Sequence, residues 1–360
     1  MMPRICEIVR HATVAGTEKH VYLLADALKK KDFDITVCTF ERGEFVNALQ
    51  RRGIATYVVV SSNPIAHFMK LVLFLAKSSF NVVHCHSGGY ACLAAKVAGV
   101  RSIIYTKHGI GFTAEELDHR CFLRKVRDKL VDFCVSRYVA LTNHDKCIMS
   151  GVLGINPDKI QVIHNGIDPL YGTNTKALAF EGQPIIGTVA RLAKQKGICY
   201  LVEAAVKIRE KYPDVNILVV GSGMEENALR DLVARLDLEE HVHFLGYFES
   251  AEGIIKALDV FVLPSLWEGF PYVLLEAMML KKPIVATDIF GINEIIQHNK
   301  SGLLIEPRNA DAISSAVINL CSSKKKARRL GDCAYHTVQN RFSLDNTVSK
   351  VENLYLSFVS

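Results

Sequence analysis

Short apolar runs alternate with longer amphipathic stretches along the first half of the chain. Apolar runs of about four to eight residues, separated by stretches of helical length, are typical of buried parallel strands joined by helices. The predicted strands are residues 5–9, 35–40, 56–60, 82–86, 102–107, 138–141 and 161–163. The predicted helices are residues 18–30, 44–51, 65–78, 90–98 and 143–152, with a further helical segment that ends near residue 135. The pattern therefore predicts an α/β domain with helices on both faces of a parallel sheet.

The same alternation starts again in the second half, after a segment rich in Gly, Asn, Thr and Pro at residues 165–183. Predicted strands cover residues 184–189, 216–220, 242–245, 260–263 and 284–286, and predicted helices cover residues 198–211 and 225–236. Residues 344–359 form one more helical segment, with an apolar face of Val348, Val351, Leu354, Tyr355 and Phe358. Because 360 residues exceed what one core usually supports, we expect two doubly wound domains, with ligands at the carboxyl ends of their strands.

The segment from residue 263 to residue 278 carries the most specific chemistry. A predicted buried strand leads into a turn with Glu268 and Gly269, and Pro271 suits the first position of the helix that follows, to about residue 280. Glu276 lies on that helix. Two carboxylates thus flank a helix N-terminus, whose free N–H groups attract anions. The arrangement suits a ligand with sugar hydroxyls and phosphates.

Charge and composition limit which partners and which class of function the sequence can be expected to have. The net charge is +6, and Lys and Arg exceed Asp and Glu by 22 to 15 before residue 169, against 21 to 22 after it. This excess suits an acidic partner such as an anionic lipid surface, although an ordinary solvated face explains it as well. No basic motif with interleaved aromatic residues indicates nucleic-acid binding.

The cysteines bear on the cellular compartment. The ten cysteines include no C-x-x-C pair, which favours a reducing cytosol over disulfides or a zinc site. The chain opens on a strand rather than a secretory signal, and its longest apolar stretch, residues 68–76, is too short to span a bilayer.

The block Glu268-Gly269-Phe270-Pro271, followed by Glu276, resembles the Glu-x7-Glu signature of retaining, GT-B-fold glycosyltransferases of family 4. The resemblance implies that Glu268 contacts the donor sugar and that Glu276 holds the nucleotide ribose. It also implies two Rossmann-like domains facing each other across a cleft. The acceptor domain would comprise residues 1–168, with a C-terminal helix at about 344–360 packing back on it, and residues 169–343 would bind the nucleotide-sugar donor.

Two blocks in the first half match the same family. Gly16 lies between the first strand and its helix, where its lack of a side chain permits close approach of a ligand. Lys107 and His108 end a strand, and the resemblance favours a role for His108 at the reacting sugar. With Gly111 they are predicted to form an active-site loop. The basic amphipathic segment at residues 118–130 could lie on anionic lipid, and an ordinary solvated helix is the alternative.

The remaining blocks lie in the second half. Arg191 and Lys196 follow its first strand. The Arg191 guanidinium, with its paired N–H donors, and the Lys196 ammonium suit a diphosphate leaving group, which would make a metal ion unnecessary. Gly221 opens a Gly-x-Gly turn that does not complete the nicotinamide-binding G-x-G-x-x-G pattern. Tyr247 lies in a loop that resembles the element beside which the family seats its base.

The sequence therefore predicts a retaining, metal-independent hexosyl- or N-acetylhexosaminyltransferase without a cofactor. Catalytic roles are expected for His108, Arg191, Lys196 and Glu268, and substrate binding for Gly16, Lys107, Gly221, Tyr247, Gly269, Phe270, Pro271 and Glu276. UDP is the expected nucleotide. The expected acceptor is a sugar or a lipid-linked sugar in glycan, polysaccharide or lipopolysaccharide assembly, at the cytoplasmic side of a membrane. A sugar-nucleotide 2-epimerase or hydrolase, and a catalytically silent sugar-nucleotide-binding protein, remain as alternatives.

Overall fold

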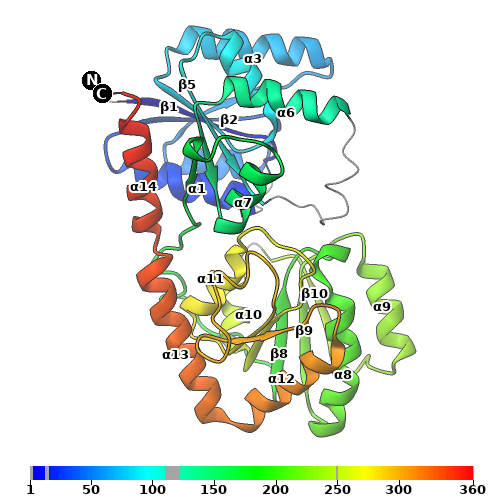
Figure 1. Cartoon of the computed structure of the whole chain (residues 1–360). Helices are drawn as coiled ribbons and strands as arrows, with labels where there is room; N and C mark the ends of the chain where they lie inside the picture. The colour runs from blue at the N-terminus through cyan, green and yellow to red at the C-terminus, as the bar shows by residue number, and fades with distance from the viewer. Residues whose placement is uncertain (1–2, 13–15, 110–121, 249, 360) are drawn as a thin grey trace. The chain divides into compact units, whose positions relative to one another are not determined.

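The computed structural model describes residues 3–12, 16–109, 122–248 and 250–359, and for residues 122–127 it describes the helical backbone only. Within it the chain divides into two compact units (Figure 1). Unit 1 consists of Met1–Asn165 together with Leu344–Ser360, and unit 2 consists of Gly166–Ser343. In the described parts of the chain, no helix combines the length and the apolar character that crossing a bilayer requires.

Unit 1 is built on a seven-stranded parallel sheet in the order β3-β2-β1-β4-β5-β6-β7. Its strands are β1 (Arg4–Val9), β2 (Asp34–Thr39), β3 (Ala55–Val58), β4 (Val82–Cys85), β5 (Ser102–Lys107), β6 (Arg137–Ala140) and β7 (Ile160–Val162). Because all strands are parallel, their carboxyl ends lie at one edge of the sheet, where Rossmann-like domains bind ligands.

The helices of unit 1 cover both faces of this sheet. They are α1 (Gly16–Lys29), α2 (Glu44–Arg51), α3 (Pro64–Ser78), α4 (Gly88–Val97), α6 (Phe122–Cys134), α7 (Asn143–Gly151) and α14 (Leu344–Leu356). Neighbouring strand residues alternate between two cores: Ile5 lies in the core beneath α1, α2 and α14, and Cys6 in the core beneath α3, α4 and α6. The terminal helix α14 thus packs within unit 1 through the predicted apolar face.

Local signals explain where α3 begins. Asn63 is its N-cap, and the Asn63 side chain accepts hydrogen bonds from the backbone N–H groups of Ile65 and Ala66. Pro64 at the first helical position has no N–H to satisfy. Ser79, in the left-handed conformation, ends the helix.

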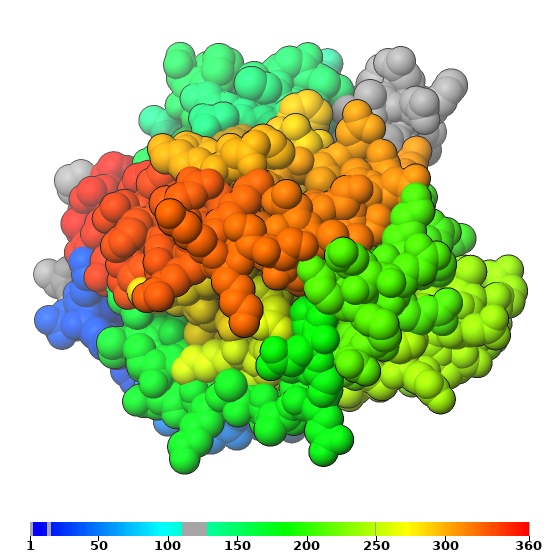
Figure 2. Space-filling model, turned by 90° about the horizontal axis from the view of Figure 1, so that it is seen from below, coloured from blue at the N-terminus to red at the C-terminus, as the bar shows by residue number. Residues whose placement is uncertain are grey.

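Unit 2 holds a six-stranded parallel sheet in the order β10-β9-β8-β11-β12-β13, around a second core. Its strands are β8 (Ile185–Val189), β9 (Asn216–Val220), β10 (Val242–Gly246), β11 (Val260–Leu263), β12 (Ile284–Thr287) and β13 (Leu303–Ile305). Its helices are α8 (Ile198–Lys211), α9 (Glu226–Arg235), α10 (Glu252–Ala257), α11 (Tyr272–Met279), α12 (Ala310–Ser322) and α13 (Lys324–Arg341). Helices α12 and α13 form part of the surface of unit 2 (orange in Figure 2).

The predicted α/β fold class, with two parallel-sheet domains, is confirmed. Most predicted boundaries lie within two residues of the observed ones, and α8, β9 and β11 agree fully. Pro271 is the N-cap of α11 rather than its first residue, and α14 ends at Leu356 rather than residue 359. Gly111 and residues 118–121 of the predicted basic helix lie outside the described residues.

Candidate active site

A buried ion pair in unit 2 joins two of the predicted catalytic residues. Lys196 follows β8 and Glu268 follows β11, and the Lys196 Nζ lies 2.6 Å from the Glu268 Oε1. The two side chains are only 16% and 6% exposed. The hydroxyl of Ser265 donates a second hydrogen bond, of 2.7 Å, to the same Oε1. The carboxylate is therefore fixed by two donors at the carboxyl end of the sheet.

Backbone contacts hold the two loops that carry this pair. The N–H of Leu266 donates to the carbonyl of Gln195 at 2.7 Å, and the Gln195 side chain donates to the carbonyl of Trp267 at 2.8 Å. Gly197, with φ +60°, allows the loops to approach, because a Cβ at this position would lie 2.2 Å from the Pro264 carbonyl oxygen. Lys196 and Glu268 are thus positioned by one shared set of contacts.

Arg191 and Gly221 lie where two neighbouring strands of unit 2 end. A Cβ on Gly221 would lie 1.9 Å from the carbonyl oxygen of Ala190, so only glycine allows the turns after β8 and β9 to meet. The Arg191 side chain is exposed, and its guanidinium donates a long hydrogen bond, of 3.5 Å, to the Oε1 of Gln195. It is therefore available to a negatively charged ligand.

Glu276 lies on α11, beyond the turn formed by Gly269, Phe270 and Pro271. Its side chain is largely buried near Tyr171 and Tyr272. Burial, and secondly the Glu276 carboxylate, raise the pKa of both phenols, which therefore stay protonated and can donate hydrogen bonds.

Two aromatic residues predicted to bind substrate, Phe270 and Tyr247, differ in the exposure of their side chains. The Phe270 ring is buried and packs edge-on against Phe342, with centroids 5.3 Å apart, so its backbone rather than its ring could contact a ligand. Tyr247, by contrast, is 60% exposed just after β10, as a base-stacking residue would be. Its location fits the predicted role without testing it.

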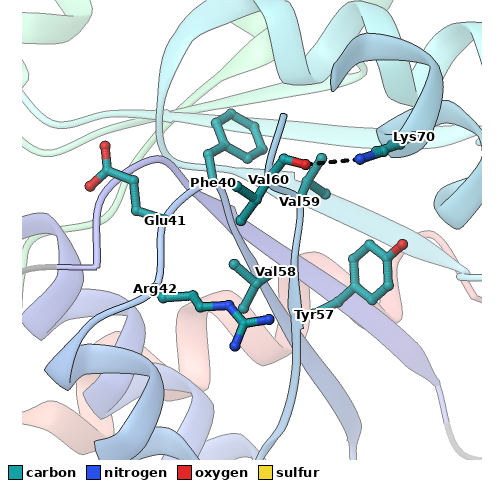
Figure 3. Close-up of a pocket in the computed structure, with 8 residues that line it drawn as sticks. All are labelled: Phe40, Glu41, Arg42, Tyr57, Val58, Val59, Val60 and Lys70. Carbon is teal, nitrogen blue, oxygen red and sulfur yellow. Dashed lines mark hydrogen bonds between the residues drawn. The ribbon is translucent and has the colours of Figure 1, made fainter. Parts of the chain in front are cut away.

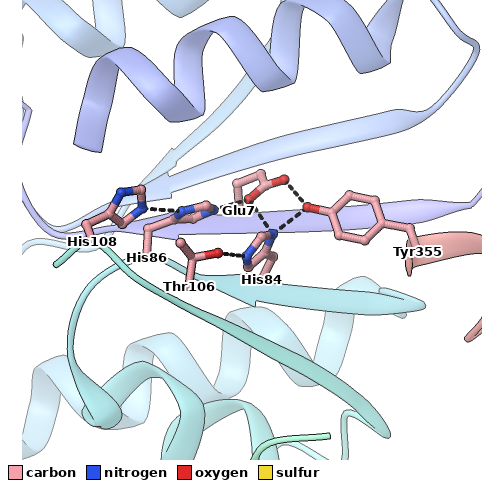
Figure 4. A network of polar contacts seen from close by, with 6 residues as sticks. All are labelled: Glu7, His84, His86, Thr106, His108 and Tyr355. Atoms are coloured by element: carbon pink, nitrogen blue, oxygen red, sulfur yellow. Dashed lines mark hydrogen bonds and ion pairs between the residues drawn. The ribbon is translucent and has the colours of Figure 1, made fainter. Parts of the chain in front are cut away.

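In unit 1, His108 belongs to a buried polar network at the carboxyl end of the sheet (Figure 4). His108 follows β5 and His86 follows β4, and the His108 Nε2 lies 2.9 Å from the His86 Nδ1. The other ring nitrogen of His86 lies 2.6 Å from the Oε2 of Glu7, a residue of β1. Both His86 and Glu7 are buried. A chain of hydrogen bonds thus connects His108 to a buried carboxylate.

The same network continues to the C-terminal helix. Tyr355 of α14 donates its hydroxyl proton to the Glu7 Oε1 at 2.5 Å. The Nδ1 of His84 lies 2.6 Å from the Tyr355 hydroxyl, and its Nε2 lies 2.6 Å from the hydroxyl of Thr106. Glu7 is therefore satisfied on both oxygens, as a fully buried carboxylate requires.

The network assigns protons to the histidines. Burial, followed by the neighbouring histidines, holds the pKa of His108 and of His84 well below the usual range, so both rings are neutral. An ionised Glu7 only accepts, so His86 carries its proton on Nε2. With His86 neutral, His108 then donates from Nε2 and keeps Nδ1 as an acceptor. His108 can accept a hydroxyl proton there, while Glu7 stabilises positive charge on the histidine pair.

The other predicted residues of unit 1 lie at the same edge of the sheet. Gly16 begins α1, and a Cβ added to it would meet no atom within 4 Å, so packing does not demand a glycine here. Lys107 ends β5, with its ammonium 5.8 Å from the ring centroid of Tyr105.

His20 and its neighbours also have the chemistry of metal ligands. Ligand atoms of His20, His86 and His108 lie within 4.8 Å of one another, as do those of Glu7, His84 and His86. Both ring nitrogens of His86 already form hydrogen bonds, so an ion would have to replace one of them. Metal independence therefore stays a prediction.

A cavity of about 710 Å³ opens beyond the carboxyl ends of β2 and β3 (Figure 3). It is lined by residues 40–42, residues 57–60 and Lys70 of α3. The Lys70 ammonium donates to the carbonyl of Val60 at 2.9 Å, and Arg42 supplies a second cation. The cavity combines an apolar wall with two cations and the carboxylate of Glu41, whose Oε1 lies 3.1 Å from the Nδ1 of His11. The excess of cations suits a phosphorylated ligand with an apolar part.

The buried histidines predict that the protein loses stability in acid. Burial, and secondly His86, lower the pKa of His20 from 6.5 to about 3, and His84 and His108 shift in the same direction. Below about pH 6.5 the unfolded chain therefore binds more protons than the folded one, and the free energy of unfolding falls as pH falls, by up to about 1.4 kcal/mol per pH unit for each group.

Thermal unfolding measured between about pH 7.5 and pH 5 checks this. His20→Asn should make the dependence shallower, and His336→Gln, at an exposed position, is the control for the loss of one histidine. Equal slopes for the wild type and His20→Asn would contradict the expectation.

Sequence reasoning missed several residues of these sites. Glu7, His84 and His86 lie on or next to apolar strands, and Tyr355 was read only as part of an apolar helix face. A signal was present, because Glu7 interrupts an otherwise apolar strand and must find partners when buried. Ser265, which donates to Glu268, and Gln195, which donates to the Trp267 carbonyl, carried no comparable signal in the sequence.

Comparison with known proteins identifies the family. The family model described as glycosyl transferases group 1 matches residues 173–337, and that of Glycosyltransferase Family 4 matches residues 14–170. A UDP-Gal:alpha-D-GlcNAc-diphosphoundecaprenol alpha-1,3-galactosyltransferase of Escherichia coli is 30% identical, over 99% of this chain and 97% of that protein. The capsular polysaccharide biosynthesis glycosyltransferase CapM of Staphylococcus aureus is 23% identical over 92% of each chain.

Among solved structures, Anabaena HepE in complex with UDP and glucose matches with a TM-score of 0.85, at 20% identity, over 99% of this chain and 100% of that one. This likeness shows the GT-B fold. The chain therefore belongs to glycosyltransferase family 4 and is a GT-B glycosyltransferase that acts on a nucleotide sugar.

Proposed function

We propose that this protein is a retaining glycosyltransferase that transfers a hexosyl or N-acetylhexosaminyl group from a UDP-linked donor to a hydroxyl group of a lipid-linked saccharide. The observation that carries the proposal is the buried Lys196–Glu268 pair, at the carboxyl ends of the unit 2 strands and just before the N-terminus of α11. Support for the substrates comes from the E. coli relative, whose name gives a UDP-galactose donor and a diphosphoundecaprenol-linked acceptor.

Unit 2 would bind the donor. Glu268, held by Lys196 and Ser265, would accept hydrogen bonds from the transferred sugar, and Glu276 would accept from the ribose hydroxyls. Tyr247 would stack on the base. Arg191 and Lys196, together with the backbone N–H groups that follow Pro271, would hold the diphosphate. Gly221 would allow the loops around the nucleotide to meet.

Unit 1 would bind the acceptor. His108, Lys107 and Gly16 lie at the edge of the sheet, and the cavity lined by Arg42 and Lys70 opens at the same edge. Its apolar wall and its two cations, which outnumber the Glu41 carboxylate, suit a lipid diphosphate. Action on such an acceptor would place the protein at the cytoplasmic face of a membrane.

The chemistry would be a front-face displacement without a protein nucleophile. The Oε1 of Glu268 already accepts two hydrogen bonds, which favours a role in binding the sugar over nucleophilic attack on its anomeric carbon. As the bond to the diphosphate breaks, Arg191 and Lys196 would stabilise the developing negative charge, and the acceptor hydroxyl would pass its proton to His108 with the help of the departing phosphate. The held ammonium of Lys196 and the exposed guanidinium of Arg191 would supply this stabilisation without a metal ion.

A transfer assay with UDP-galactose, UDP-glucose or UDP-N-acetylglucosamine and a GlcNAc-diphospholipid acceptor tests the proposal. We expect one donor to give a product with retained anomeric configuration, and excess EDTA to leave the rate unchanged. Donor incubated without acceptor separates the alternatives, because an epimerase or a hydrolase consumes it. Consumption of the donor without acceptor would contradict sugar transfer. An inverted product would contradict the retaining mechanism, and loss of activity in EDTA would contradict metal independence.

A further inference from the structure

The outer surface of three neighbouring helices in unit 1 is unusually apolar. Helix α4 packs against both α3 and α6, so the three form one layer on one face of the sheet (Figure 1). Of the 19 large apolar side chains exposed in the described residues, eight lie on this layer, three each on α3 and α4 and two on α6. We call these eight the apolar face: Ile65, Met69, Leu73, Tyr90, Leu93, Val97, Leu130 and Phe133. Folded monomers seldom leave such a cluster uncovered.

Helix α3 shows that this exposure is systematic. Leu71, Val72 and Leu75 point into the core, as an amphipathic helix requires. Ile65, Met69 and Leu73, spaced four residues apart, form a second apolar stripe directed outward, and Ile65 is 75% exposed. A helix with an apolar stripe on both sides is suited to two apolar surroundings, of which the domain core is only one.

The charges around the part of the apolar face on α3 and α4 are all positive, and acidic residues occur only on α6, where Asp128 and Asp132 accompany Leu130 and Phe133. From residue 45 to residue 114 the chain has no Asp or Glu, and this stretch contains all of α3 and α4. Exposed lysines border the apolar face at positions 70, 77, 96 and 129. The Lys96 ammonium lies 5.5 Å from the ring centroid of Phe133, so cation and apolar group are directly adjacent.

We propose that the apolar face docks on the interfacial region of an anionic lipid bilayer. Exposed Leu, Ile and Phe side chains would enter the boundary between headgroups and acyl chains, and the bordering lysines would bind lipid phosphates. A protein partner fits less well, because protein interfaces are depleted in lysine. The proposal rests on exposed side chains and charge alone, and it stands whether or not the assigned sugar transfer is correct.

Co-sedimentation of the full chain with vesicles tests the proposal. One set of vesicles contains phosphatidylcholine alone and the other contains about one third phosphatidylglycerol, which supplies the negative surface. We expect binding to the anionic vesicles that weakens with added salt. The double variant Ile65→Ser/Leu73→Ser should lower the partition coefficient at least about tenfold. Lys77→Gln/Lys96→Gln should reduce the preference for anionic vesicles.

The matched control is Leu356→Ser on α14, an exposed apolar residue on a helix that packs on the opposite face of the sheet. It should bind vesicles as the wild type does, and circular dichroism and Tm should show that all variants are folded. Equal partition of Ile65→Ser/Leu73→Ser and Leu356→Ser would overturn the proposal. A second outcome would also overturn it: a wild type that self-associates and does not bind vesicles, together with a monomeric Ile65→Ser/Leu73→Ser variant. The apolar face would then bind a second copy of the chain.

Discussion

Replacing Lys196 by methionine is expected to lower the rate of sugar transfer about 10²- to 10³-fold, the usual cost of losing one group that stabilises charge in a transition state. The same change should lower the free energy of unfolding by about 3 to 5 kcal/mol, because it leaves a buried carboxylate without its cation. The magnitude follows from the geometry: the Lys196 Nζ lies 2.6 Å from the Glu268 Oε1, and the Glu268 side chain is only 6% exposed.

A second variant separates these two effects. In Lys196→Met/Glu268→Gln the glutamine oxygen can still accept from Ser265, and no unpaired charge remains. Stability should therefore recover to within about 1 to 2 kcal/mol of the wild type, whereas transfer should stay lost. Urea unfolding can be followed through Trp267, the single tryptophan of the chain, which lies in unit 2.

Lys207→Met provides the matched control for charge removal. Lys207 and Asp311 also form an ion pair in unit 2, of 2.7 Å, but their side chains are 55% and 74% exposed. Such a pair contributes about 0 to 1 kcal/mol, so both stability and transfer should change little. Wild-type turnover in Lys196→Met, or recovery of transfer in the double variant, would remove Lys196 from the proposed mechanism.

The sequence predicted the fold because its local signals agree with the global arrangement. Strands such as β5, β9 and β11 are short apolar runs with polar or turn residues at both ends. Helix α8 follows Gly197 and ends before the strand that begins at Asn216. Hydrophobic periodicity and turn residues were therefore enough to place these elements. Strand β13 and helices α10, α12 and α13 were not predicted. The three residues of β13 are too few for a periodic pattern to identify a strand.

The candidate site was only partly predictable, for a different reason. Lys196 and Glu268 were assigned to separate ligand groups, and nothing local to either one indicates that they bind each other across 72 residues of sequence. The contact between Glu7 and Tyr355 spans 348 residues. Residue type and spacing show which side chains can do chemistry, whereas the partners that fix their protonation and orientation depend on tertiary packing.

Replacing Glu7 by glutamine tests the largest of these long-range effects. The Glu7 carboxylate accepts from His86 on one oxygen and from Tyr355 on the other, and a glutamine can accept on only one side. If its amide NH₂ faces His86, the proton of His86 must move to Nδ1, and His108 must then accept at Nε2 and present Nδ1–H. We expect kcat to fall about 10²-fold, the typical contribution of a positioned acid or base, with little change in the donor KM.

A merely structural effect of this change is distinguished by Tyr355→Phe and by the pH profile. Tyr355→Phe removes a hydrogen bond from the same carboxylate but leaves the contact between His86 and His108, so it should cost about 1 to 3 kcal/mol of stability while kcat stays within about threefold. In Glu7→Gln the buried negative charge that favours a protonated histidine pair is gone, so the acidic limb of the kcat profile should move to lower pH. Equal losses of kcat in both variants, with unchanged pH profiles, would mean that the network supports the fold of unit 1 without setting the proton on His108.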